Sequence, residues 1–256
     1  MQRPPKGLPL IPVTPIHDAI NRINGKQAEL TKLGWRTNDQ SSIRVFVERA
    51  FTQAVLGLTG VEASLDQIAT IQARPVDQLR TEAGPDMKIL RTLASIKVLE
   101  KAVDNSESLT PDLLLRIHDP FLDRPSTGEE AETDSDSDLN KSVLARVGAF
   151  CQWAGAHSFK ELNPLEQAAI AILRLLEIRA FQEGNVGAAI GAGSLFTMRA
   201  GWPPIIVPGQ LQARFNPAVG EGLKMNTRPL IDLLAGSIHE TLNSMISFAT
   251  TSPDRG

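Results

Sequence analysis

The sequence lacks several features on which common functions depend. It contains one cysteine and no tyrosine in 256 residues. A single cysteine excludes an internal disulfide and a zinc site built from cysteines. No apolar run approaches the roughly 18 residues of a membrane-spanning helix, and the N-terminus lacks the charged region and long apolar run of a signal peptide. We therefore expect no membrane association, and we expect the protein to be cytoplasmic.

An excess of positive charge is also missing. The formal net charge is −3 at pH 7, whereas nucleic-acid-binding domains usually present a basic face. We therefore exclude nucleic acid as a partner. The hydrophobic share of 42% is enough for a substantial core, and the length suits one large domain.

Side chains that could serve as nucleophiles or metal ligands are few. Cys151 follows Leu144 and Val147 at the spacing of an apolar helix face, which predicts a buried structural thiol. No two of the four histidines have metal-ligand spacing, and no Ser/His/Asp pattern is visible. His118 lies beside an apolar stripe, where a histidine is usually a core or capping residue. The sequence outside residues 177–204 therefore predicts no catalytic centre.

Helical periodicity dominates the chain, and it predicts an all-α fold. Apolar residues recur at the spacing of one helix face, and Thr110 followed by Pro111 is a typical helix start. Strand-like alternation is scarce, and residues 205–208 are the best short candidate. The expected helices cover residues 41–58, 86–104, 140–157, 164–179, 187–199 and 228–248.

Two segments stand apart from the helices. Residues 1–38 are predicted to form an N-terminal arm and a helix, since prolines at positions 4, 5, 9, 12 and 15 favour an extended strap. Residues 39–250 then form the helical domain. Within it, residues 126–138 contain six acidic and no basic side chains, which predicts a mobile surface loop. A calcium loop is not expected there, because Leu139 occupies the position of the required glycine.

The most informative stretch is residues 177–204, EIRAFQEGNVGAAIGAGSLFTMRAGWPP. It predicts two helices joined by a Gly/Asn loop, a geometry that directs backbone N–H groups at an anion. The stretch resembles the H-P-F-x-D/E-G-N-G-R-x-x-R signature of the Fic/Doc (Fido) family, which transfers AMP from ATP to a protein hydroxyl. Residues 108–122 and 52–68 resemble two further family segments. The resemblance implies a Fic-like helical bundle with an extended N-terminal arm and few or no strands.

The resemblance also assigns roles to the residues of the loop that match. Glu183 stands at the acidic position that holds a metal ion in the family. Gly184 and Asn185 match the Gly-Asn pair that curls round the phosphates. By this resemblance ATP, or another nucleotide with Mg²⁺, is the candidate ligand, while the residues themselves assign no cofactor.

Other positions of the motif depart from the family pattern. Arg179 replaces the histidine that acts as general base in the family, and a guanidinium stays protonated at physiological pH, so it cannot take that role. No catalytic residue is therefore assigned. Gly187 and Ile190 replace the two motif arginines, and Val186 replaces the second glycine, where a positive φ would strain a β-branched residue. Arg179 and Gly187 remain candidate binding residues.

Glu62 is the candidate regulatory residue. It lies in TGVEAS, which resembles the inhibitory-helix segment of the family. In the family this glutamate pairs with the last motif arginine. Because Ile190 stands there, we expect that regulatory contact to be lost.

Two interpretations of the function follow from these departures. The first is a Fic-like protein that lacks AMP transfer and uses the old nucleotide cleft to bind an anion or a protein partner. The alternative is an active nucleotidyl- or phospho-transferase with altered chemistry, and a scaffolding role or a homodimer also stays open. Arg179 itself has two interpretations. In the first it is structural, as an ion-pair partner of Glu183 or a surface cation. In the second it is a fixed cation that holds a phosphate.

Overall fold

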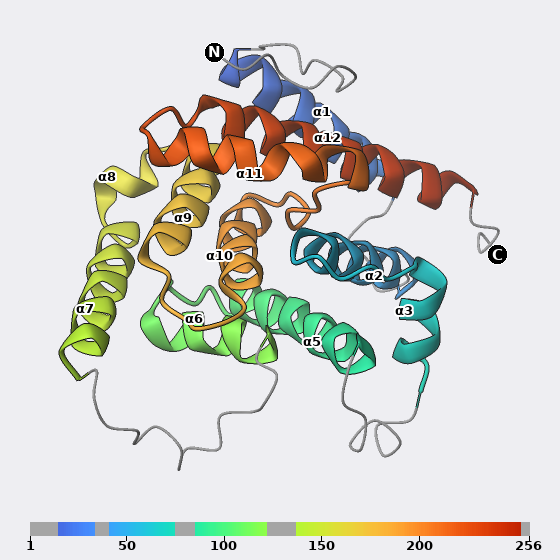
Figure 1. Cartoon of the computed structure of the whole chain (residues 1–256). Helices are drawn as coiled ribbons and strands as arrows, with labels where there is room; N and C mark the ends of the chain where they lie inside the picture. The colour runs from blue at the N-terminus through green and yellow to red at the C-terminus, as the bar shows by residue number, and fades with distance from the viewer. Residues whose placement is uncertain (1–14, 34–40, 75–84, 122–136, 252–256) are drawn as a thin grey trace, which may run out of the picture.

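The chain is a bundle of helices without strands in the part that the computed structural model describes. That part comprises residues 15–33, 41–74, 85–121 and 137–251, and it contains eleven α-helices and one 3-10 helix (Figure 1). The predicted all-α class is therefore confirmed. The elements are α1 (Ile16–Lys32), α2 (Ser41–Leu58), α3 (Leu65–Gln72), α5 (Pro85–Asp104), α6 (Pro111–His118), η1 (Asp119–Phe121), α7 (Ser137–Ala154), α8 (His157–Lys160), α9 (Pro164–Ile178), α10 (Asn185–Arg199), α11 (Gly209–Leu223) and α12 (Arg228–Thr251).

Helix α10 forms the centre of the bundle. Figure 1 shows it between α9 and α2, with α11 and α12 on one side and α5 and α6 on the other. All residues from Gly187 to Thr197 are buried. Its glycines allow this enclosure, because a Cβ at Gly191 would lie 2.6 Å from a methyl carbon of Ile117. The small residues of this helix therefore serve close packing.

The segment after α10 is extended, yet it forms no strand. Side chains of α10 hold it instead: the Ser194 hydroxyl accepts the N–H of Ile205 at 2.9 Å, and the Thr197 hydroxyl donates to the carbonyl of Pro203 at 2.9 Å. Within residues 205–208, the best strand candidate in the sequence, Ile205 thus bonds a side chain where a strand would need a neighbouring strand.

Most of the predicted helices are present, with shifted ends. The helix over 41–58 is confirmed as α2, while the predicted helix over 140–157 is divided into α7 and α8. The pattern did not predict α11, because Pro217 lies inside it and proline normally disrupts a helix interior. Its buried residues nevertheless recur at helical spacing, from Leu211 through Phe215 to Val219.

Helix α3 packs on a small hydrophobic cluster of its own. This cluster comprises buried residues of α2, α3 and α5: Leu56, Ile68, Ile71, Ile89 and Leu93. A polar contact fixes the same helix, since the Gln72 amide donates to the buried Glu48 carboxylate at 2.7 Å and accepts from Arg49 at 2.7 Å. The segment between α2 and α3 is thereby held against the bundle.

The structure tests some of the remaining sequence predictions and leaves others untested. Residues 1–14 of the proline-rich N-terminal segment and most of the acidic segment 126–138 lie outside the described residues. Cys151 is buried, and burial raises the pKa of its thiol to about 11, which fits a structural thiol. None of the described helices is both long and apolar enough to cross a bilayer.

Candidate functional site

The loop with the motif resemblance begins where α9 ends. The start of α9 is fixed by a capping box, in which the Asn163 side chain accepts from the N–H of Glu166 and the Glu166 carboxylate accepts from Asn163 in return. Its end is Arg179, whose φ of 50° is left-handed and whose N–H bonds the carbonyl of Leu175 at 3.0 Å. The Arg179 side chain is exposed, and the ion pair with Glu183 that the sequence allowed does not form.

The Asn185 side chain holds the loop in shape. Its amide donates to the carbonyl of Phe181 at 2.6 Å and accepts the N–H of the same residue at 3.1 Å. Both backbone groups of Phe181 are therefore satisfied by one side chain. This pairing gives Asn185 a structural role in the loop that is independent of any ligand.

His118 supports the loop from α6. Its ring stacks on Phe181 with centroids 3.5 Å apart and planes within 6°. Its Nε2 lies 2.8 Å from the carbonyl oxygen of Glu183, and because a carbonyl only accepts, Nε2 carries the hydrogen. Burial lowers the pKa of His118, against the opposing effects of this hydrogen bond and of Asp119. His118 is therefore the core histidine that its sequence context predicted.

The depressed pKa of His118 gives a pH prediction. The unfolded chain binds a proton to this ring near pH 6.5, whereas the folded protein does so only at lower pH, so stability is full above pH 6.5 and falls as the pH drops through the folded pKa. We expect urea denaturation between pH 7 and pH 5 to show a smaller loss of stability in His118→Gln than in the unsubstituted protein. If the free energy of unfolding fell equally with pH in the two proteins, the prediction would be contradicted.

Helix α10 starts without a side-chain cap. Its N-cap is Gly184, whose φ of 71° is left-handed, and no described side chain accepts the N–H groups of Asn185, Val186 or Gly187. These groups form the positive end of the helix dipole. Val186 lies inside α10 and is not among the residues with positive φ, so the strain that a positive φ would cause there is absent.

The two positions that replace motif arginines are enclosed by apolar groups. A Cβ at Gly187 would lie 2.6 Å from the ring of Phe121, and Ile190 is 0% exposed. The structure therefore gives the residues at both positions apolar surroundings and supplies no cation there.

Other cations lie beside the loop. A cavity of about 180 Å³ opens next to Glu183 and Gly184, and α5 contributes Lys88 and Arg91 to its wall. The motif pattern did not point to these two residues, although their spacing of three places both on one face of a helix. The remaining lining residues are Val55, Leu56, Thr59, Val61, Thr92 and Phe121.

A complete metal site is not preformed around Glu183. No group of three or more His, Cys, Asp or Glu side chains within the described ranges could hold a metal ion. The exposed carboxylate of Glu183 is thus available as one ligand only. Its assignment as a metal ligand remains a prediction.

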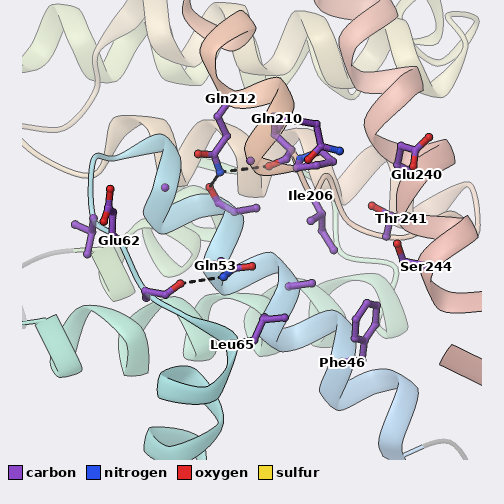
Figure 2. Close-up of a pocket in the computed structure, with 18 residues that line it drawn as sticks. Phe46, Gln53, Glu62, Leu65, Ile206, Gln210, Gln212, Glu240, Thr241 and Ser244 are labelled. Atoms are coloured by element: carbon purple, nitrogen blue, oxygen red, sulfur yellow. Dashed lines mark hydrogen bonds between the residues drawn. The ribbon is translucent and has the colours of Figure 1, made fainter. Parts of the chain in front are cut away.

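Glu62 lies in a different cavity from Glu183. It lines a larger pocket between α2, α12 and the segment that precedes α11 (Figure 2), and it is exposed. Val61 is the one residue common to the walls of both cavities. A regulatory role for Glu62 at the motif loop stays a prediction.

Comparison with known proteins identifies Fic adenylyltransferases as relatives. No family model matches the chain. The chain is 24% identical over 159 residues to the protein adenylyltransferase Fic of Nematostella vectensis, a match that covers 59% of this chain and 37% of that protein. It is 27% identical over 112 residues to the protein adenylyltransferase fic-1 of Caenorhabditis elegans, covering 44% of this chain and 22% of that protein. The matches therefore span well under half of these curated relatives.

Solved structures show the same fold. The Fic-1 structure from C. elegans superposes with a TM-score of 0.72 at 17% identity, covering 93% of this chain and 74% of that one. A Fic domain containing signaling protein from Bacteroides thetaiotaomicron gives a TM-score of 0.69 at 16% identity, covering 91% of this chain and 98% of that one. The helical bundle is thus the Fic fold over nearly the whole chain.

Proposed function

Because the chain belongs to the Fic family, we propose that it binds a phosphate-bearing ligand at the loop of residues 179–185 and does not transfer AMP by the histidine-dependent reaction. The adenylyltransferase activity in the names of its relatives belongs to those proteins, of which this chain covers only a part. The proposal rests on the side chains that this chain presents at the loop.

The observation that carries the proposal is the side chain at the end of α9. The resemblance places the general base at this position, and here it is the exposed cation of Arg179. The nearby imidazole of His118 does not replace the base, because it is buried, stacked on Phe181 and bonded to the carbonyl of Glu183. Loss of a general base typically lowers a rate about 10²- to 10⁴-fold.

The ligand class follows from the charges around the loop. The uncapped N–H groups of α10, together with Lys88 and Arg91 in the adjoining cavity, favour an anion. The γ-phosphate contact that the resemblance implies is missing, since Ile190 is buried and the ring of Phe121 covers Gly187 at the two positions of the motif arginines. A phosphate group reached from the α5 side suits these residues better than ATP in the binding mode of the family.

A second candidate function is transfer chemistry of another kind. The observation in its favour is that the Glu183 carboxylate lines the same cavity as Lys88 and Arg91. A carboxylate beside two cations suits a metal-bound phosphate. The loop carries no histidine, and its one carboxylate, Glu183, would be engaged by the metal in this reaction, so binding is the stronger proposal.

Calorimetric titration with inorganic phosphate, ADP and ATP, each with and without Mg²⁺, tests the binding proposal. We expect Lys88→Gln to weaken binding about two- to fivefold, as for an exposed charge contact. Lys97→Gln is the matched control, because Lys97 is an exposed lysine of the same helix that does not line the cavity. Absence of binding at millimolar ligand would defeat the proposal.

The absence of AMP transfer needs a separate assay. We expect no transfer of label from α-labelled ATP to proteins of a cell extract. A robust signal that survives Arg179→Ala and is lost in Asn185→Ala would overturn this part of the proposal and favour the second candidate. Because Asn185 also shapes the loop, circular dichroism must show that this variant remains folded.

A further inference from the structure

A second, larger cavity adjoins the segment that joins α2 and α3. Its volume of about 540 Å³ falls within the range of ligand pockets. Its walls are α2, residues 61–65, residues 206–210 and the face of α12 that carries Glu240, Thr241 and Ser244 (Figure 2). Apolar side chains of Phe46, Leu65 and Ile206 form part of its lining.

The charges of this cavity are of one sign. Glu62 and Glu240 are its only charged lining residues, and both are exposed. Neither carboxylate forms an ion pair within the described part of the chain. Figure 2 shows them at opposite ends of the cavity. Two unpaired carboxylates and no basic side chain favour a positively charged ligand.

Two glutamines add fixed acceptors between the carboxylates. Gln53 donates its amide to the carbonyl of Ala63 at 3.0 Å, and Gln212 donates to the carbonyls of Ala54 and Val207 at 3.3 and 3.4 Å. Because each amide nitrogen is engaged, the oxygen is the group left for a ligand. In Figure 2 the Gln53 oxygen points away from the dashed hydrogen bond that its amide nitrogen makes.

The position of Gln212 depends on a glycine of α2. A Cβ at Gly57 would lie 2.6 Å from both terminal atoms of the Gln212 amide. The amide therefore rests directly on the backbone of α2. This close approach holds the acceptor in a defined place on the cavity wall.

The extended segment beside α11 contributes unpaired donors. Neither Ile206 nor Val207 donates its backbone N–H to another described residue, although both residues are buried. Both residues line the cavity. Donors on an extended backbone are the groups that an added peptide strand can use.

From these observations we infer that the cavity binds an extended segment of a partner protein that carries basic side chains among apolar ones. The carboxylates and glutamine oxygens receive the basic groups, and the apolar lining receives the alternate side chains. The site is separate from the phosphate site, with which it shares Val61 alone. It therefore stands whether or not a phosphate binds at the motif loop.

Fluorescence anisotropy with defined peptides tests this inference on the full chain. The probe is a labelled heptapeptide in which two lysines alternate with leucine, valine and leucine between terminal glycines, and the controls carry glutamine or glutamate in place of lysine. We expect the lysine peptide to bind at least about fivefold more tightly than the glutamine peptide, and binding to weaken as salt is raised.

Substitutions assign the binding to this cavity. Glu62→Gln and Glu240→Gln should each weaken binding of the lysine peptide about two- to fivefold, and Ser244→Arg, which adds a cation to the wall, should weaken it further. Glu177→Gln is the matched control, since Glu177 is exposed on α9 and does not line the cavity. All variants should keep the melting temperature of the unsubstituted chain.

Three results would overturn the inference. The first is equal binding of the lysine and glutamine peptides. The second is lysine-peptide binding that the cavity variants leave unchanged. The third is a concentration-dependent dimer that Glu62→Gln or Glu240→Gln dissociates, which would make the occupant a second copy of this chain.

Discussion

Replacing Ile190 by arginine should lower the free energy of unfolding by more than about 3 kcal/mol. The motif resemblance places an arginine at this position in the Fic family. In this chain the residue is 0% exposed on the central helix, within the main hydrophobic core. An unpaired guanidinium enclosed in such a core loses its hydration without gaining a partner.

Urea denaturation provides the measurement, with Ile190→Met as the control. Methionine conserves volume without a charge, so it should cost less than about 1.5 kcal/mol. An arginine variant as stable as the methionine variant would contradict the prediction. It would mean that the longer side chain passes Phe121 and reaches the cavity beside Glu183.

Any attempt to rebuild the family motif in this chain meets similar obstacles. An arginine at position 187 would have to displace the ring of Phe121, which lies 2.6 Å from the place of its Cβ. Restoring the motif letters therefore requires changes in the surrounding packing as well.

The sequence predicted the elements that local patterns specify. Thr110 before Pro111 predicted the start of α6, and the Thr110 hydroxyl indeed accepts the N–H of Leu113 at 3.1 Å. The apolar period predicted α2 to the residue. Such features depend on neighbours a few positions apart, so one sequence is sufficient to find them.

Features that depend on distant contacts could not be predicted in the same way. The stack of His118 on Phe181 joins residues far apart in the chain, and Lys88 and Glu183 line one cavity although they lie on separate elements. The strain predicted for Val186 assumed that the loop keeps a positive φ at that position. Helix α10 begins at Asn185, two residues before the predicted start, and the left-handed position is its N-cap, Gly184.

Gly184→Ala should lower the free energy of unfolding by about 2–4 kcal/mol, as the sum of backbone strain and crowding. The strain arises because its φ of 71° is left-handed. The crowding arises because an added Cβ would lie 2.7 Å from the Cβ of Phe121 and 3.2 Å from Nε2 of His118. The Cβ of Phe121 is attached directly to the backbone, so it cannot rotate away from the added methyl group as the end of a flexible side chain could.

Gly60→Ala separates these two contributions. Gly60 has a φ of 80°, and nothing lies within 4 Å of a Cβ built there, so only backbone strain of about 1–2 kcal/mol is expected. Urea denaturation of both variants then gives the crowding contribution as the difference. Equal destabilisation by the two substitutions would show that η1 and His118 move away from the added methyl group with little loss of free energy of unfolding. A larger destabilisation by Gly184→Ala would mean that Phe121 and His118 hold the start of α10 rigidly. The proposed phosphate site needs that rigidity, because its backbone donors lie in this turn.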